Sequence, residues 1–266
     1  MPIHSTQFEP TPGGLTLTSA ILLYKAGTKN APPADGAQAF ASFHGVEHHE
    51  AGPMIGAGAP LTHHHLRQWT RALGNTSGPE ILPANVLVAH ADMIAWWVPE
   101  QVRTAYFALS NPPADLKALS ERTTVAVPYP AHLFVATRRA LGVYALPKSE
   151  HPSADTVLLH SPILNVFLEG HLCWGNIAKP KALSIASIAE YERAVFDSWS
   201  THPNPGQELT VKGRGGLVRI WDDLAARKAR RFPVKRMLPF NPKPEKRGAG
   251  SATMTLGALV AAKVVA

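Results

Sequence analysis

Residues 160–176 read HSPILNVFLEGHLCWGN and contain Cys173, the only cysteine among 266 residues. Gly170 and Gly175 bracket this cysteine at short range, and Pro180 ends the segment. Glycine and proline at such spacings are typical of loops, which often carry functional side chains on a rigid scaffold. A single cysteine either packs as a small apolar residue or acts as a nucleophile, and the stretch itself leaves both interpretations open.

Apolar, β-branched runs precede the cysteine loop and predict strands. The expected strands are TLTSAILLY (16–24), NVLVA (85–89), MIAWWV (93–98), VRTAYFA (102–108), TTVAV (123–127), HLFVATRRALGVYAL (132–146) and TVLLH (156–160). The Pro-Glu corner between the third and fourth runs predicts a hairpin over residues 97–102. The last three runs predict an antiparallel meander that leads into the cysteine loop.

Helical patterns flank these strands. Thr62 is a candidate cap for a helix over residues 63–73 that ends at Gly74, and Pro113 opens one or two helical turns over residues 113–120. After the loop, residues 182–199 carry one apolar stripe at spacings of three and four, which predicts the longest helix. Residues 217–231 predict a further helix that ends before a proline.

Composition is that of a globular protein with a loop-rich single core, since 45% of residues are hydrophobic and 17% are charged. One cysteine cannot form an internal disulfide, and the N-terminal residues lack the pattern of a signal peptide. No uncharged apolar run approaches the roughly 20 residues that span a bilayer. We therefore expect a soluble cytoplasmic protein with no membrane partner.

The net charge of +7 is concentrated near the C-terminus. Residues 222–247 hold nine Lys or Arg and three Asp or Glu, a net of +6. The segment ARKARRFPVKR (226–236) could contact nucleic acid, but it holds one aromatic residue and no recognisable nucleic-acid fold. A solvated helix face, or a docking surface for an acidic protein, explains the charge equally well.

The cysteine stretch resembles the active-site segment of ubiquitin-conjugating enzymes. In those enzymes the Asn of a His-Pro-Asn tripeptide lies eight residues before the catalytic cysteine, with a Gly three residues before it and an aliphatic residue one before it. Asn165, Gly170 and Leu172 stand at these three offsets from Cys173. The sequence departs from the pattern where an Ile-Leu pair replaces the His-Pro pair and Trp-Gly-Asn follows the cysteine.

A longer set of motifs resembles the B-protein family of PRTRC cassettes, a prokaryotic branch (family D) of the ubiquitin-conjugating superfamily. The motifs lie between residues 81 and 240 and are LPANVL, WWVP, VPYP, HSPILNVFLEGHLCWGN, FDSWSTHPN and FPVKRMLPF. The resemblance implies a bacterial gene cassette, often on plasmids. It also implies that the cassette encodes a ThiF-like activating enzyme, a JAB-type peptidase and a ParB-related protein.

The resemblance implies an α+β fold with a ubiquitin-conjugating-enzyme-like antiparallel sheet meander and flanking helices. Residues 1–80 would add an N-terminal strand and helix, residues 81–210 would form the core, and residues 211–266 would form a basic helical C-terminal extension and tail. We expect the final 16 residues to be a disordered tail or a strand that binds a partner.

The resemblance also assigns the chemistry. Cys173 would accept the C-terminus of a ubiquitin-like modifier as a thioester from the ThiF-like enzyme, with no metal or organic cofactor. Asn165 would position the tetrahedral oxyanion, although an Asn at this place could simply bond its own loop backbone. His171 shares a face with Cys173 in an extended segment and could favour the thiolate, or it could be a solvated loop histidine. His160 and Glu169 are weaker candidates for that work.

Other functions compete with conjugation. A cysteine hydrolase would use Cys173, His202 and Asn204 as nucleophile, base and orienting group. The 13 histidines suggest a metal site, with His44 and His48 as candidate ligands, but three consecutive histidines at 63–65 point about 100° apart on a helix. A scaffold that has lost activity, or a nucleic-acid-associated protein of the cassette, is the non-catalytic alternative.

Overall fold

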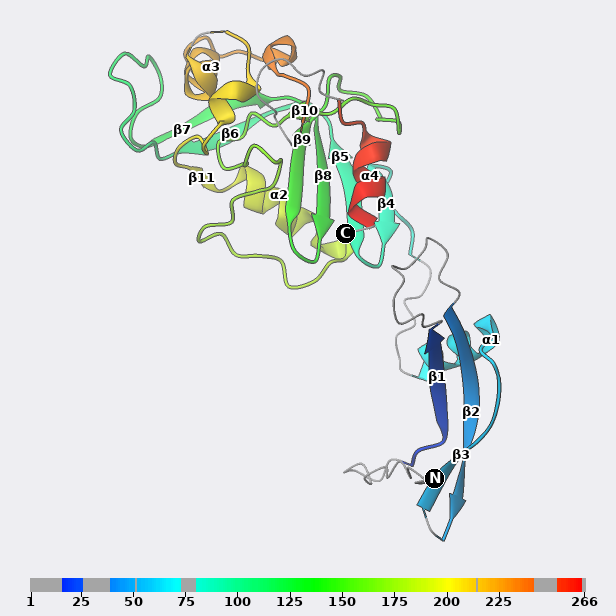
Figure 1. Ribbon diagram of the computed structural model, residues 1–266. Helices are drawn as coiled ribbons and strands as arrows, with labels where there is room; N and C mark the ends of the chain where they lie inside the picture. Colours follow the sequence, from blue (N-terminus) through cyan, green and yellow to red (C-terminus); the bar gives the residue numbers. More distant parts are fainter. Residues whose placement is uncertain are drawn as a thin grey trace, which may run out of the picture. The chain divides into compact units, whose positions relative to one another are not determined.

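The computed structural model (Figure 1) describes residues 16–25, 39–50, 52–72, 80–213, 215–241 and 253–264. The chain divides into two compact units, Met1–Glu80 and Ile81–Ala266. The candidate site stretch belongs to the second unit.

The described residues of the first unit form a three-stranded antiparallel sheet and one helix. The sheet has the order β1-β2-β3 and consists of β1 (Ser19–Lys25), β2 (Ala39–His49) and β3 (Gly52–Pro60). The helix α1 (His63–Ala72) begins where the sequence predicts it, because Thr62 Oγ1 accepts a hydrogen bond from the His65 N–H at 3.4 Å. The predicted end at Gly74 lies outside the described residues.

The second unit contains two sheets. The larger sheet has the order β10-β9-β8-β5-β4, with all neighbours antiparallel. Its strands are β4 (Val86–His90), β5 (Met93–Val98), β8 (His132–Thr137), β9 (Leu141–Ala145) and β10 (Leu159–His160). The smaller sheet has the order β11-β6-β7 and consists of β6 (Gln101–Phe107), β7 (Thr123–Tyr129) and β11 (Trp199–Ser200), with β11 parallel to β6.

The predicted hairpin over residues 97–102 is wrong. β5 pairs with β4 and β8, whereas β6 pairs with β7 in the other sheet. Pro99 has no N–H to donate, and the Glu100 N–H donates to Ser149 Oγ at 2.8 Å, so the chain leaves the larger sheet at this corner. The almost wholly buried β5 thereby gains a strand on each side.

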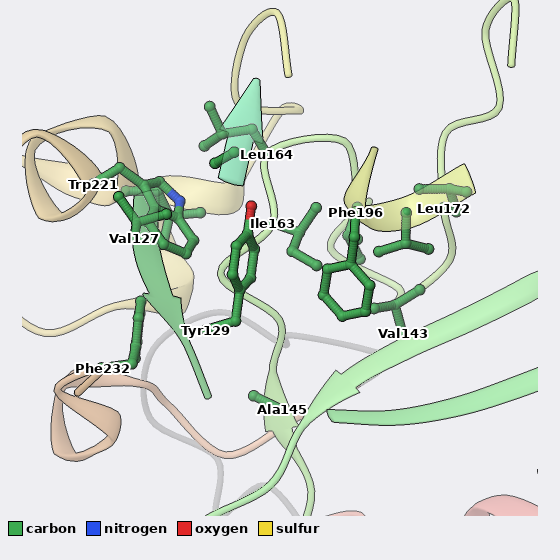
Figure 2. Close-up of a cluster of buried hydrophobic side chains, with 14 of the residues drawn as sticks. Val127, Tyr129, Val143, Ala145, Ile163, Leu164, Leu172, Phe196, Trp221 and Phe232 are labelled. Carbon is green, nitrogen blue, oxygen red and sulfur yellow. The ribbon is translucent and has the colours of Figure 1, made fainter. Parts of the chain in front are cut away.

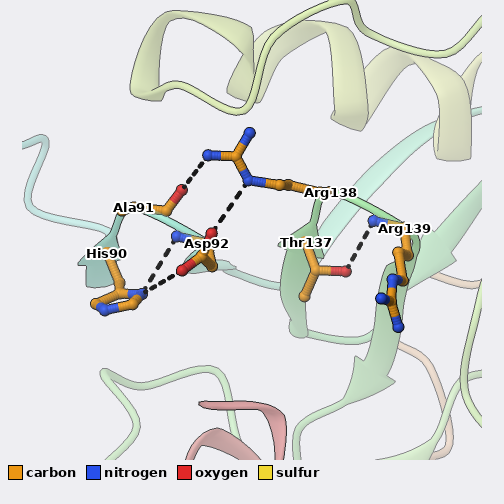
Figure 3. Close-up of polar contacts among 6 residues, drawn as sticks. All are labelled: His90, Ala91, Asp92, Thr137, Arg138 and Arg139. Carbon is orange, nitrogen blue, oxygen red and sulfur yellow. Dashed lines mark hydrogen bonds and ion pairs between the residues drawn. The ribbon is translucent and has the colours of Figure 1, made fainter. Parts of the chain in front are cut away.

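The turns at one end of the larger sheet are joined by polar contacts (Figure 3). Arg138 in the β8–β9 turn donates through Nε to Asp92 Oδ1 at 3.1 Å and through Nη2 to the Ala91 carbonyl at 3.4 Å. His90 Nδ1 accepts the Asp92 N–H at 3.2 Å. These bonds fix the β4–β5 turn against the turn that precedes β9, the strand on which the cysteine loop rests.

The helices of this unit are short. They are η1 (Ile185–Ser187), α2 (Ile188–Phe196), η2 (Gln207–Thr210), α3 (Gly216–Ala226), η3 (Val234–Arg236) and α4 (Leu256–Val264). The helix predicted over residues 182–199 ends at Phe196, because Trp199 and Ser200 extend along β6 as β11. α3 ends at Ala226, because Lys228 adopts a left-handed conformation (φ 48°) and the Ala229 N–H reaches back to the Leu224 carbonyl at 3.0 Å.

Residues 113–120 were predicted to form one or two helical turns, but the structure has no helix there. Instead, the carboxylate of Asp222 on α3 accepts the N–H groups of Lys117, Ala118 and Leu119 at 2.7–3.0 Å. A buried carboxylate satisfies these N–H groups as well as a helical turn would, so the segment stays irregular.

Both faces of the larger sheet are buried, and strand alternation separates them. On β8, Phe134 belongs to a core cluster with α2 and α3, while Leu133 belongs to a second cluster with α4. Figure 2 shows part of the first cluster. The second cluster includes Leu256 and Leu259 of α4, so the described C-terminal residues form a packed helix rather than the predicted disordered tail or strand.

Candidate functional site

The offset of eight residues between Asn165 and Cys173 is the geometry of a short hairpin. The Cys173 N–H donates to the Asn165 carbonyl at 2.6 Å, and the Phe167 N–H donates to the His171 carbonyl at 2.8 Å. An antiparallel bridge joins Val166 to Leu172 between these bonds. The hairpin therefore holds the asparagine and the cysteine opposite each other.

The hairpin is attached to β9 next to the two residues that pair with β10. The Val143 N–H donates to the Gly170 carbonyl at 2.7 Å, and the Leu172 N–H donates to the Leu141 carbonyl at 2.9 Å. Gly170 has a φ of 85°, and a Cβ there would collide with the ring of Tyr144. The positive φ and the lack of space for a Cβ both require a glycine three residues before the cysteine.

Apolar side chains fix the underside of the hairpin. Ile163, Leu164 and Leu172 are at most 3% exposed and pack in the first core cluster (Figure 2). Ile163 and Leu164 occupy the positions of the His-Pro pair in the ubiquitin-conjugating motif. In this chain these two positions therefore contribute to the hydrophobic core.

A groove of about 770 Å³ opens beside the hairpin. Asn165 and Cys173 line it, together with residues 174–180 on one side and residues of α2 and the following loop on the other. Cys173 is half-buried, which leaves its thiol within reach of a ligand in the groove. Two of the three predicted site residues thus lie in one concave surface.

His171 does not line this groove. Its backbone pairs with Gly142 of β9, and its ring lies 6.0 Å from the ring of Phe167. His160 is also remote from the lining and packs against Phe240 with ring centroids 5.1 Å apart. Burial lowers the pKa of His160 to about 4, and Glu169 is exposed on the hairpin turn.

The side chain of Asn165 is hydrogen-bonded to the backbone of another groove residue. Its Nδ2 donates to the Trp199 carbonyl at 2.9 Å. The amide therefore bonds the backbone of β11, which lies 34 residues away, and not the neighbouring loop backbone. One amide hydrogen is used in this contact, and the bond fixes the plane of the amide group.

Buried side chains brace the chain that leads to Asn165. Trp221 Nε1 donates to the Pro162 carbonyl at 2.9 Å, and Gln207 Nε2 donates to the Ile163 carbonyl at 2.8 Å. Gln207 is 1% exposed, and its Oε1 accepts the Asn204 N–H at 2.6 Å. Gln207 could not be predicted from the sequence, because its role depends on a partner 44 residues away and leaves no local pattern.

His132 supports the same segment from below. Its Nδ1 lies 2.7 Å from the Pro130 carbonyl, which can only accept, so Nδ1 carries the proton. Nε2 then accepts from Ser161 Oγ at 3.2 Å. Burial lowers the pKa of His132 to about 4, and the hydrogen bond to Pro130 opposes this shift only in part.

The residues of the hydrolase hypothesis also meet in the groove. His202 and Asn204 line it with Cys173. His202 is exposed, with Nδ1 2.9 Å from Thr201 Oγ1, whereas Asn204 is only 6% exposed. The sequence identified both residues, but it gave no reason to place them beside Asn165.

The other hypotheses find less support. Phe232, the one aromatic residue of the basic segment, is 5% exposed and packs on Trp221, so it cannot stack on a base. His44 bonds Ser42 Oγ at 2.7 Å and the Gly56 carbonyl at 2.8 Å. Within the described part of the chain, no three His, Cys, Asp or Glu side chains gather as metal ligands would, and no helix is long and apolar enough to cross a membrane.

Comparison with protein-family models gives a match over most of the second unit. The family model described as Prokaryotic E2 family D matches residues 65–240, about two thirds of the chain. The match includes the whole hairpin and every groove residue discussed above. No curated protein and no solved structure matches the chain significantly.

Proposed function

The chain belongs to prokaryotic E2 family D, and we propose that it accepts the C-terminus of a ubiquitin-like modifier as a thioester on Cys173 and passes it to an amine. The observation that carries the proposal is the shared groove. Cys173 and Asn165 face each other across a hairpin with a 2.6 Å backbone hydrogen bond, and both line the same concave surface. An extended C-terminal tail fits a groove of this kind.

The chemistry needs only the groove and the thiol. The thiolate of Cys173 attacks the carbonyl carbon of the activated modifier, a C–S bond forms, and the carbonyl electrons move onto oxygen. Collapse of this oxyanion expels the thiolate or phosphate of the donor. An amine then attacks the thioester, loses its proton to solvent, and releases the Cys173 thiolate.

Asn165 has a positioning role in this proposal. Its amide is held at 2.9 Å from the Trp199 carbonyl, so its orientation is set before a substrate arrives. The second amide hydrogen remains for a carbonyl oxygen of the modifier tail. His171 acts at most from outside the groove, because it is absent from the lining.

The partners follow from the family. An E2-like protein works between an activating enzyme and a modifier, and we propose the ThiF-like enzyme of a PRTRC cassette as the donor. A JAB-type peptidase of the same cassette would remove or process the modifier. The exposed basic residues that follow α3 are available to an acidic surface of such a partner.

Reconstitution tests the proposal. The full chain is mixed with the ThiF-like enzyme of its cassette, the small ubiquitin-like proteins encoded there, and ATP. We expect an adduct on non-reducing gels that needs ATP, disappears with dithiothreitol and is absent from Cys173→Ala. An adduct that persists in Cys173→Ala would exclude Cys173 as the acceptor, and no adduct with any combination would refute thioester transfer.

The groove also favours a second candidate, a cysteine hydrolase. Cys173, His202 and Asn204 all line it, as a nucleophile, a base and an orienting group would. This candidate predicts hydrolysis of small thioesters or peptides without ATP, and loss of that hydrolysis in His202→Gln. Transfer to amines without such hydrolysis would favour conjugation.

A further inference from the structure

One polar group in the groove has no partner. Asn204 is 6% exposed and lines the groove, yet its Nδ2 makes no hydrogen bond. Among the side chains that the structure describes, only Trp97 Nε1 is also buried without a partner, and Trp97 does not line the groove. Burying an amide donor without an acceptor costs about 1–3 kcal/mol, so folding alone does not explain this arrangement.

The backbone N–H of Asn204 is hydrogen-bonded, whereas its buried side-chain Nδ2 is not. The Asn204 N–H donates to Gln207 Oε1 at 2.6 Å, and the same Gln207 donates to the Ile163 carbonyl, two residues before Asn165. Gln207 therefore ties the backbone of Asn204 to the segment that leads into the cysteine hairpin. Pro203 and Pro205 on either side restrict its backbone further.

Asn165 and Asn204, which both line the groove, differ in the number of amide hydrogens that remain unbonded. Asn165 already donates one amide hydrogen to the Trp199 carbonyl, whereas Asn204 has both amide hydrogens unused. An acceptor that appears only when a substrate occupies the groove would satisfy the second amide. The oxyanion that forms when Cys173 attacks a carbonyl is such an acceptor.

We propose that Asn204 is the oxyanion donor for acyl transfer at Cys173, and that Asn165 acts mainly as a positioning residue. The inference rests on the proposed thioester function. When the Cys173 sulfur bonds the carbonyl carbon, the electron pair of the C=O moves to oxygen, and the Asn204 amide, whose Nδ2 is buried in the free protein, turns into the groove and donates to it. When the leaving thiolate departs, the carbonyl re-forms and the amide is released. The same amide serves again when an amine attacks the thioester.

The test uses a probe that needs no partner protein, a fluorescein-labelled Gly-Gly thioester of mercaptoethanesulfonate. Transfer of the acyl group to Cys173 of the full chain gives a fluorescent, dithiothreitol-sensitive adduct whose rate of formation is measured. Asn204→Leu keeps the approximate size of the side chain and removes the donor. We expect it to slow adduct formation about 100-fold, as loss of an oxyanion donor does elsewhere.

Asn85→Leu is the matched control, because Asn85 Nδ2 donates to the Trp97 carbonyl at 3.2 Å outside the groove. We expect it to lower the thermal midpoint and leave the rate unchanged. Asn204→Leu is expected to slow adduct formation and to leave the thermal midpoint unchanged or higher, because no hydrogen bond is lost and an unsatisfied amide is removed. This contrast separates a catalytic role from a structural one.

The outcomes are distinguishable. No adduct with the unaltered chain would overturn the thioester function and the role of Asn204 with it. A normal adduct rate in both Asn204→Leu and Asn204→Ala would overturn only the role of Asn204. A slowed rate accompanied by a fall in thermal midpoint as large as that of Asn85→Leu would also overturn it, because Asn204 would then be structural. A slowed rate at an unchanged or raised midpoint, in either variant, supports the proposal.

Discussion

Acidification should weaken the second unit through His132. The ring is 1% exposed and is surrounded by Tyr129, Phe134 and Phe196, and its Nε2 accepts from Ser161. Protonation would place a positive charge in this apolar site, which is why burial lowers the pKa to about 4. A histidine whose folded pKa lies below its unfolded value contributes stability above about pH 6.5, and this contribution is lost as the pH falls toward 4.

The size of the effect follows from the pKa difference. A fall from 6.5 to about 4 corresponds to about 3 kcal/mol in full, and about 2 kcal/mol of this is lost between pH 8 and pH 5. His160 is 7% exposed and has the same lowered pKa, so it contributes a similar amount. The free energy of unfolding should therefore fall by about 4 kcal/mol over this interval.

Urea unfolding at pH 8 and pH 5 measures this difference. Tryptophan fluorescence is a suitable signal, because five of the six tryptophans lie in the second unit. We expect His132→Phe to be less stable at pH 8 and to show about half the loss on acidification, about 2 kcal/mol. His151→Gln, which changes an exposed histidine, should keep the full loss. An unchanged pH dependence in His132→Phe would refute the reasoning.

Two further predictions concern the chain around the site. Asp222→Ala should lower the free energy of unfolding by about 3 kcal/mol, because three N–H groups of residues 117–119 lose a buried acceptor. Asp115→Ala breaks only an exposed ion pair with Arg219, so it should lower the free energy of unfolding far less in the same urea titration. Gly170→Ala should lower the free energy of unfolding by more than about 2 kcal/mol, because the new Cβ would meet the Tyr144 ring and the backbone φ is 85°. At Gly175 a Cβ would meet open space, so Gly175→Ala should lower it by only about 1 kcal/mol, for the left-handed backbone alone. Equal melting temperatures of the two glycine variants would contradict the packing argument.

The local patterns of the sequence predicted local structure well. β1, most strands of the second unit, the Thr62 cap and the loop at Cys173 depend on neighbouring residues, and the structure contains them, whereas β2 and β3 of the first unit were not predicted. Features decided by distant partners were not predictable. The separation of β5 from β6 depends on Ser149, and the irregular path of residues 113–120 depends on Asp222. Both partners lie about 50 or more residues away.

The same division holds for the site. The spacing of Asn165, Gly170 and Cys173 encodes a hairpin, so the sequence could reveal it. The periodicity of an extended segment placed His171 on the face of Cys173, but the groove lies beside Cys173 and does not include His171 in its lining. Asn204 was visible only as part of a hydrolase pattern, because its unpaired amide is a property of three-dimensional packing.

The bonds between the groove walls suggest how stability and function are linked. Asn165 reaches across to the Trp199 carbonyl, and Gln207 joins the Asn204 N–H to the Ile163 carbonyl. The bonds from Asn165 and from Gln207 to Ile163 connect segments about 35–45 residues apart, so the groove depends on the tertiary packing that brings these segments together. Asn165 keeps one amide hydrogen unbonded, whereas the Nδ2 of Asn204 makes no hydrogen bond at all. The rigid segments around Asn204 can hold such an unsatisfied donor in place until a substrate supplies its acceptor.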